Sequence, residues 1–178
     1  NRKCSFCPRS DPDYPDINEF ISEKLHKKLC DELSELNYTG LIIYSGFVEP
    51  MLDKNIYNLI SYAKKTNPQS RVEIISNGDV LNKSRLKKIY KSGLDRLQLS
   101  LYDGEDQFLK FKKLGEELNL SKFQYVLRKR YLPEEQDFGI TLSNRGGMLE
   151  NSEFKIPAVK EKLKEECTYP GYKFFLDY

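Results

Sequence analysis

Two cysteines near the start of the chain, Cys4 and Cys7, are separated by two residues. Thiolates at this spacing can bind zinc, form a redox-active pair or ligate an iron–sulfur cluster. A zinc ribbon needs a second close pair, and the remaining cysteines, Cys30 and Cys167, stand alone. The spacing by itself therefore leaves these chemistries open.

Three polar loops offer a second group of candidate residues. The segments Ser45–Pro50, Ser76–Asp79 and Ser100–Asp103 each follow a short, mostly apolar run. In parallel α/β sheets, ligands bind at the carboxyl ends of the strands, and small residues there let a ligand approach the backbone. Ordinary turn chemistry uses the same residue types. The loops indicate a ligand site only when they are taken together with the cysteines.

The elements that position these loops follow from hydrophobic spacing. The spacing predicts helices at 18–36, 52–65, 83–91 and 105–118, and strands at 41–44, 72–75, 97–101 and 123–127. Ser22 is expected to be an N-cap, and either Asn82 or Ser84 is expected to cap the third helix. Strands separated by helices imply right-handed crossovers, so the expected fold class is α/β with a parallel sheet.

The first helix is expected to place its leucines on the core. The apolar stripe that its spacing predicts comprises Phe20, Leu25, Leu29, Leu33 and Leu36. On this helix, Cys30 is interpreted as a buried small hydrophobe and His26, among lysines, as an exposed residue. Arg128, at a strand end, could bind a carboxylate or be solvated.

Beyond residue 130 the alternation of strands and helices stops. A short strand at 140–142, a turn at 144–147, a helix at 158–166 and a strand at 172–178 are expected there. This pattern indicates the beginning of a second module, and the predicted domains are 1–130 and 131–178.

The composition of the chain narrows the classes of protein to which it could belong. The 178 residues carry a net charge of +2, with 39% hydrophobic and 31% charged residues, which is typical of one soluble globular domain. There is no basic stripe, apolar span or signal peptide, so neither a nucleic-acid partner nor a membrane is expected. Four cysteines without other marks of secretion favour the cytoplasm.

The segment Asn1–Arg9 resembles the Cys-x3-Cys-x2-Cys motif of the radical SAM superfamily, with an aromatic residue just before the last cysteine. The family's first cysteine would fall one position before Asn1. The resemblance continues in order along residues 1–130. Ser45–Pro50 resembles the Gly-Gly-Glu-Pro-type motif, Ile75–Gly78 resembles the Thr-Asn-Gly strand end, and Leu99–Gly104 resembles the strand end near the ribose.

This resemblance implies a partial (β/α)6 TIM-like barrel whose first strand is truncated. It implies that Cys4, Cys7 and a third thiolate hold a [4Fe–4S] cluster, which cleaves S-adenosylmethionine to give a 5′-deoxyadenosyl radical. Glu49 would accept from the methionine amino group, although it could instead only cap a helix. The implied cofactor-binding residues are Gly46, Phe47, Glu49, Pro50, Asn77, Ser100 and Asp103. Val48 departs from the family pattern, because a glycine usually stands there.

The end of the chain resembles the entrance to a SPASM-type extension, through Cys167–Pro170 and Phe174–Asp177. In that subfamily, the cysteine at the position of Cys167 binds an auxiliary iron–sulfur cluster. The resemblance implies a small-molecule or peptide substrate and a reductant such as flavodoxin or ferredoxin, and it leaves the catalytic residue unknown. The alternatives are a non-catalytic iron–sulfur or zinc module and a degenerate radical SAM scaffold.

Overall fold

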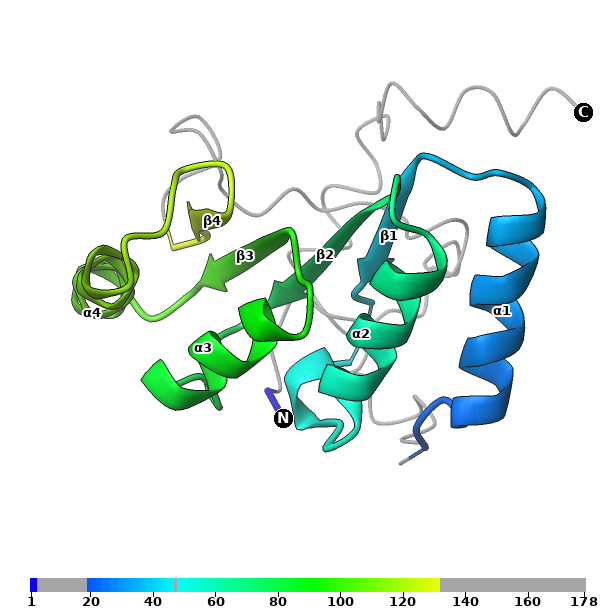
Figure 1. Ribbon diagram of the computed structural model, residues 1–178. Helices are drawn as coiled ribbons and strands as arrows, with labels where there is room; N and C mark the ends of the chain where they lie inside the picture. The colour runs from blue at the N-terminus through cyan, green and yellow to red at the C-terminus, as the bar shows by residue number, and fades with distance from the viewer. Residues whose placement is uncertain (3–18, 47, 132–178) are drawn as a thin grey trace, which may run out of the picture. The chain divides into compact units, whose positions relative to one another are not determined.

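The computed structural model describes residues 1–2, 19–46 and 48–131 (Figure 1). Residues 19–131 lie within one compact unit of the chain. The helical elements are α1 (Glu23–Glu35), η2 (Pro50–Leu52, a 3-10 turn), α2 (Ile56–Thr66), α3 (Lys83–Lys91) and α4 (Glu105–Glu117). The strands are β1 (Leu41–Tyr44), β2 (Arg71–Ser76), β3 (Arg96–Leu101) and β4 (Tyr125–Lys129).

The four strands form one sheet in the order β1-β2-β3-β4, and every neighbouring pair is parallel. Each strand is joined to the next through a helix, so the carboxyl ends of all strands meet at one edge. This confirms the predicted α/β fold with a parallel sheet. The arrangement is consistent with a partial barrel.

The core lies between the helices and one face of the sheet. Helices α2 and α3 lie in front of the strands in Figure 1, and α1 lies at the right, where it packs against α2. Alternate residues of β2 and β3 point into this core and are fully buried: Val72, Ile74, Leu97, Leu99 and Leu101. From α4, Phe111 joins the same cluster, and its backbone carbonyl accepts from the Tyr125 hydroxyl of β4 at 3.1 Å. The opposite face of the sheet therefore presents a separate set of side chains.

The predicted apolar stripe of the first helix is wrong. Helix α1 begins at Glu23, after Ser22, whose side chain accepts from the Leu25 backbone N–H at 3.2 Å. The residues that α1 buries are His26 and Cys30, because these face α2. Four residues of the expected stripe are instead exposed: Phe20, Leu25, Leu29 and Leu36.

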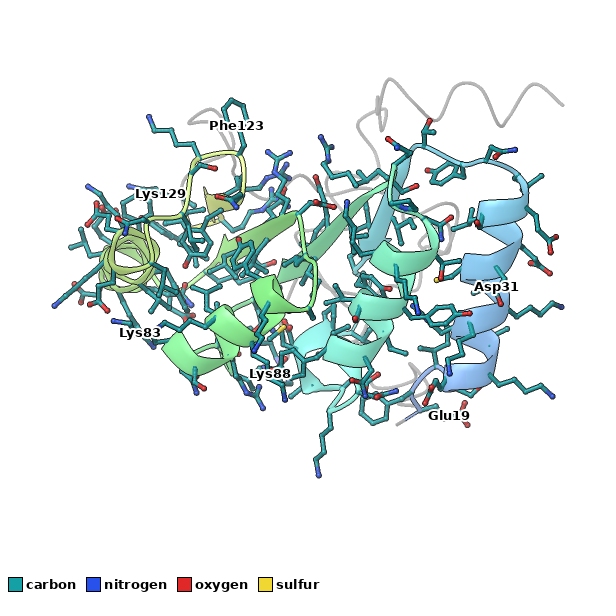
Figure 2. The ribbon with its side chains drawn as sticks, viewed as in Figure 1. Glu19, Asp31, Lys83, Lys88, Phe123 and Lys129 are labelled. Carbon is teal, nitrogen blue, oxygen red and sulfur yellow. The ribbon has the colours of Figure 1, made fainter. Side chains whose placement is uncertain are left out.

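The last strand begins two residues later than predicted. A turn holds its start, because the backbone N–H groups of Gln124 and Tyr125 both donate to the Ser121 carbonyl. Phe123 consequently points away from the sheet and is 86% exposed (Figure 2). The elements predicted beyond residue 131 lie outside the described residues. Among the described helices, none is both long enough and apolar enough to cross a membrane.

Candidate functional site at the carboxyl edge of the sheet

Glu49 is the central residue of the carboxyl edge. It follows β1 and is only 6% exposed. Its Oε1 accepts from the Met51 backbone N–H at 3.0 Å, which caps the short η2 turn that begins at Pro50. The helix-cap interpretation of Glu49 is therefore correct, but this bond uses only part of its carboxyl group.

The end of β2 supplies two further donors to Glu49. The Ser76 hydroxyl donates to Oε1 at 2.8 Å, and the Asn77 backbone N–H donates to Oε2 at 2.8 Å. Three donors thus surround the carboxyl group, which is the pattern expected of a carboxylate. All three are neutral, and no cation within the described ranges forms an ion pair with Glu49. The negative charge is held in place without being compensated by these neighbours.

The loop after β2 is shaped to present these donors. The Ser76 hydroxyl also accepts from the Gly78 N–H at 3.0 Å, and the Asn77 side chain accepts from the Asp79 N–H at 2.9 Å. Gly78 has a φ of +78°, and a Cβ there would lie 2.7 Å from the Phe111 ring. A side chain at this position would meet both backbone strain and a steric clash. Ser76 and Gly78 therefore fix the turn in which the Asn77 backbone N–H donates to Glu49.

The other predicted residues of this edge lie on neighbouring loops. Gly46 follows β1 with a φ of +135°, and a Cβ there would meet no atom within 4 Å. Ser100 is buried near the end of β3. Asp103 is exposed, and its backbone N–H donates to the Gln107 side chain at 3.1 Å. Parallel pairing brings these loops to one edge, although no direct contact joins them to Glu49 among the hydrogen bonds seen here.

Ser76 was not predicted as a site residue. Its place directly before Asn77 in the recognised strand end was visible in the sequence, but its bond to a residue 27 positions earlier was not. Val48, the departure from the family pattern, is 57% exposed.

Several predicted site residues lie outside the described part of the chain: Cys4, Cys7, Phe47 and Cys167. Within the described ranges, no group of three or more His, Cys, Asp or Glu side chains is arranged to hold a metal ion. The predicted cluster ligands therefore remain predictions from the sequence.

The prediction that His26 is exposed is wrong. It is 5% exposed, and its Nε2 lies 2.7 Å from the Tyr44 hydroxyl, which in turn donates to the Leu59 carbonyl at 3.3 Å. Burial lowers the pKa of His26, because it disfavours the charged imidazolium, while Glu23 acts weakly in the opposite direction. Cys30 is buried as predicted, and burial raises the pKa of its thiol. Both residues belong to the α1–α2 interface.

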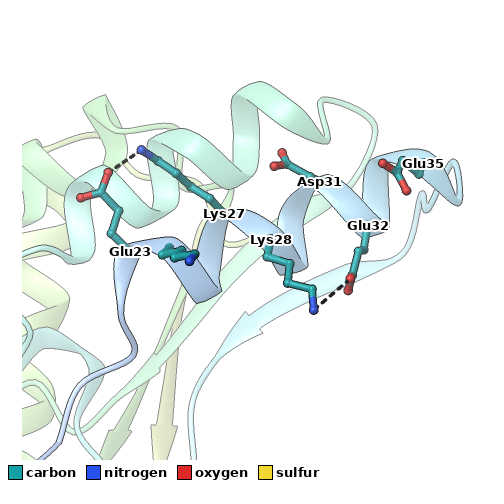
Figure 3. A pocket seen from close by; sticks show the side chains of 7 residues that line it. Glu23, Lys27, Lys28, Asp31, Glu32 and Glu35 are labelled. Carbon is teal, nitrogen blue, oxygen red and sulfur yellow. Dashed lines mark ion pairs between the residues drawn. The ribbon is translucent and has the colours of Figure 1, made fainter.

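A surface depression along α1 does not suggest a second site. Its ion pairs, Glu23–Lys27 at 2.6 Å and Lys28–Glu32 at 3.7 Å, join residues one helical turn apart (Figure 3). Its lining consists of seven residues of this single helix: Glu23, Lys24, Lys27, Lys28, Asp31, Glu32 and Glu35. A solvated helix face with charges of both signs accounts for it.

Comparison with known proteins identifies the family. The family profile described as the radical SAM superfamily matches residues 1–122. The chain belongs to the radical SAM superfamily. This is a superfamily of enzymes, and it implies S-adenosylmethionine and a [4Fe–4S] cluster.

Two curated relatives are similar to this radical SAM chain. An S-adenosyl-L-methionine-dependent 2-deoxy-scyllo-inosamine dehydrogenase of Niallia circulans is 30% identical over 171 residues, covering 96% of this chain and 63% of that protein. A PqqA peptide cyclase of Granulibacter bethesdensis is 32% identical over 76 residues, covering 43% of this chain and 19% of that protein. The chain thus spans less than two thirds of the length of these relatives.

A solved structure supports the same fold. The crystal structure of BtrN in complex with AdoMet and 2-DOIA matches with a TM-score of 0.66 and 28% identity, over 85% of this chain and 58% of that one. An open conformation of BtrN matches with a TM-score of 0.55 and 26% identity, over 71% of this chain and 50% of that one.

Proposed function

We propose that this chain binds S-adenosylmethionine along the carboxyl edge of the sheet and cleaves it reductively to start radical chemistry on a small substrate. The observation that carries the proposal is the buried carboxylate of Glu49, which forms no ion pair with any residue that the structure describes. A buried charge is costly unless a partner balances it. The ammonium group of the methionine part is a partner of the right charge, because it offers only donors where Glu49 offers acceptors.

The neighbouring residues suit the rest of that ligand. The backbone of the loop after β1 has open space at Gly46, where a ligand could approach closely. We assign Pro50, Asn77, Ser100 and Asp103 to the same edge as positioning or lining residues, together with Phe47, which lies outside the described residues. In these positions the chain's own task is to bind and orient the ligand.

Cys4 and Cys7 are proposed to be two of three thiolate ligands of the cluster. Thiolates at short spacing in a loop are the usual ligands of iron–sulfur clusters. When bound, the cluster supplies the electron that breaks a carbon–sulfur bond of S-adenosylmethionine, and the resulting radical removes hydrogen from the substrate. Flavodoxin or ferredoxin is the class of reductant that this proposal requires.

The end of the chain carries a separate proposal. We assign residues 131–178 to a linker and the beginning of a SPASM-type module, with Cys167 as a ligand of an auxiliary cluster. Its support is the sequence resemblance at Cys167–Pro170 and Phe174–Asp177.

The test is anaerobic reconstitution of the full-length protein with iron and sulfide, followed by reduction with dithionite and S-adenosylmethionine. We expect a [4Fe–4S] absorption spectrum and formation of 5′-deoxyadenosine. Cys4→Ala and Cys7→Ala should each abolish both signals. Cys30→Ala is the matched control, because Cys30 is a buried thiol of α1, and it should retain them.

A negative result would also be informative. Stable zinc binding by the wild-type protein without 5′-deoxyadenosine would overturn the proposal in favour of a non-catalytic metal module. A cluster that forms but never cleaves S-adenosylmethionine would point to a degenerate scaffold, with Val48 as the first position to restore to glycine.

A further inference from the structure

Helix α3 has a charge pattern unlike that of α1 and α4. Its nine residues include five basic side chains and no acid, and the whole stretch from Val80 to Leu94 contains no acidic residue. Helices α1 and α4 instead mix lysines with acids and form ion pairs one turn apart. Helix α2, which contacts α3, contains two lysines and no acid. The lysines of α3 are therefore not balanced by acids of these two neighbouring helices.

The helix gains no stability from this pattern. Lys83, Lys87 and Lys91 follow one another at intervals of one turn, and like charges at this spacing repel. Lys83 and Arg85 also lie in the first turn, where the helix dipole favours acids over bases. A basic stripe that opposes the stability of its own helix needs an explanation outside the fold.

The exposed lysines of this helix form a surface, the α3 face, which comprises Lys83, Lys87, Lys88 and Lys91. Lys83 and Lys88 mark this face in Figure 2. Lys83 pairs with Glu117 of α4 at 2.6 Å, and the Lys88 ammonium group lies 4.2 Å from the centre of the Tyr57 ring. Lys87 and Lys91 form no ion pair with any residue that the structure describes. Two charges of the α3 face are thus available to a partner from outside.

The amino end of α3 adjoins the candidate functional site. The Arg85 guanidinium group donates to the Met51 carbonyl at 3.3 Å and to the Val80 carbonyl at 3.1 Å. Met51 is also the residue whose backbone N–H donates to the buried carboxyl group of Glu49. A single residue, Met51, therefore connects this helix with the carboxyl edge of the sheet. A protein that docks on α3 would lie beside the edge that is proposed to bind S-adenosylmethionine.

We infer that the α3 face is the docking surface for an acidic electron-transfer protein, a flavodoxin, that reduces the cluster. The inference rests on the proposed function, because it assigns a place on the molecule to the reductant that this function requires. Reduced flavodoxin loses one electron and the oxidised cluster gains it, while no covalent bond forms or breaks. Surface charges of opposite sign steer such a partner to its site and chiefly raise the rate of association.

Two features favour an acidic protein over a nucleic acid as the partner. Arginine is the residue that recognises phosphate groups bidentately, but Arg85, the arginine of α3, donates to backbone carbonyls of its own chain. The α3 face also belongs to a single helix of nine residues, and a small contact area is typical of the transient encounters of electron transfer. Both features fit a partner that docks, delivers an electron and leaves.

The test measures binding of oxidised flavodoxin to the reconstituted full-length protein by calorimetry, at about 50 mM and about 300 mM salt. The double variant Lys87→Glu/Lys91→Glu reverses the two available charges. At low salt it should bind flavodoxin about tenfold more weakly than the wild type, because two attractions become repulsions. The affinity of the wild type should fall as the salt concentration rises, whereas that of the variant should change much less.

The matched control is Lys24→Glu/Lys28→Glu on α1. It makes the same change of net charge at the same spacing on another exposed helix face, so the affinity for flavodoxin should stay within about twofold of the wild type. The melting temperatures of both double variants should remain close to that of the wild type, because all four lysines are exposed.

Three results would overturn the inference. The first is equal weakening of flavodoxin binding in the two double variants, and the second is a wild type that does not bind flavodoxin. The third is tighter binding of an RNA oligonucleotide than of flavodoxin, lost in the α3 variant alone, which would assign the surface to nucleic acid.

Formation of 5′-deoxyadenosine separates this inference from the proposed function. With dithionite, a small reductant that needs no docking surface, the wild type and both double variants should form it at equal rates. With reduced flavodoxin at concentrations below the dissociation constant, only the α3 variant should be slower, by about tenfold. If the wild type forms none with either reductant, the proposed cleavage of S-adenosylmethionine is wrong. Salt-dependent binding of flavodoxin that the α3 variant loses would still stand as a separate result.

Discussion

Two glutamates with the same exposure, Glu49 and Glu73, show how the two ends of this sheet differ. Each is 6% exposed. Glu73, near the amino end of β2, forms ion pairs with Arg71 at 2.7 Å and with Arg96 at 3.5 Å. Glu49, at the carboxyl end, accepts from one hydroxyl group and two backbone N–H groups of the described residues. Within the described part of the chain, arginines thus balance the charge at one end of the sheet, whereas neutral donors hold the carboxyl group at the other.

The lesson is that burial alone does not mark a functional acid. A buried acid paired with arginines is already compensated, and its removal mainly affects the fold. A buried acid held by neutral donors is positioned without being compensated, and such positioning is what a ligand-binding group needs. This distinction can be tested by substituting Glu49 and Glu73 separately.

The largest expected effect follows from exchanging the two acids for amides. Glu49→Gln should weaken binding of S-adenosylmethionine on the order of 100-fold, because it removes one partner of a buried charge pair. Glu73→Gln should leave that affinity within about twofold and lower stability by about 1 kcal/mol, since both arginines are partly exposed. Calorimetric titration and urea unfolding of both variants measure these quantities. Equal losses of affinity would refute the distinction between the two ends.

A smaller loss of affinity is expected when the Ser76 hydroxyl group, which donates to Glu49, is removed. Ser76→Ala removes one of three donors, so S-adenosylmethionine should bind about five- to tenfold more weakly, and Ser76→Thr should restore binding. Ser70→Ala is the matched control. Ser70 is also buried, and its hydroxyl donates to the Tyr38 carbonyl at 2.8 Å, just before the amino end of β2.

Both serine variants should lose about 1 kcal/mol of stability, because each removes the hydrogen bond of a buried serine hydroxyl group. Only Ser76→Ala should lose affinity for the ligand. If Ser70→Ala weakens binding equally, the loss reflects general loosening of the sheet rather than the position of Glu49.

Local patterns in the sequence account for much of the fold. The strand at 41–44 and the helix at 83–91 have the predicted bounds, because short-range features set them, such as the Asn82 side chain that accepts from the Arg85 N–H. The loops of the site were also predictable, since parallel strands bring their carboxyl ends together.

Contacts between distant segments could not be predicted. The bond between Ser76 and Glu49 joins residues 27 positions apart, and spacing along the chain gives no measure of it. The orientation of α1 is a second case. Its leucines follow helical spacing, but the helix turns His26 and Cys30 toward α2, where the Asn67 side chain donates to the Cys30 carbonyl at 2.9 Å. A buried histidine among lysines has no signature in the sequence.

His26 is a third kind of buried titratable group. Its substitution is expected to have the smallest effect of the three, a change in how stability depends on pH. Glu73 is paired and Glu49 is held by donors, whereas burial favours the neutral form of His26 and lowers its pKa. The titratable and charged groups around it are Glu23, Lys27, Cys30, Asp31, Tyr44 and Tyr62. None of these offers His26 a closely paired carboxylate among the described ion pairs.

Protonation therefore favours the unfolded chain. Stability should be complete above the unfolded pKa of about 6.5 and should fall as the pH drops below that value toward the lower folded pKa. The chain has one histidine, so urea unfolding at pH 7.5 and 5.5 isolates this group from the other side chains. His26→Gln should be less stable at pH 7.5 but should lose less on acidification. An equal loss in the variant would mean that carboxylates, and not the buried imidazole, set the acid sensitivity of this unit.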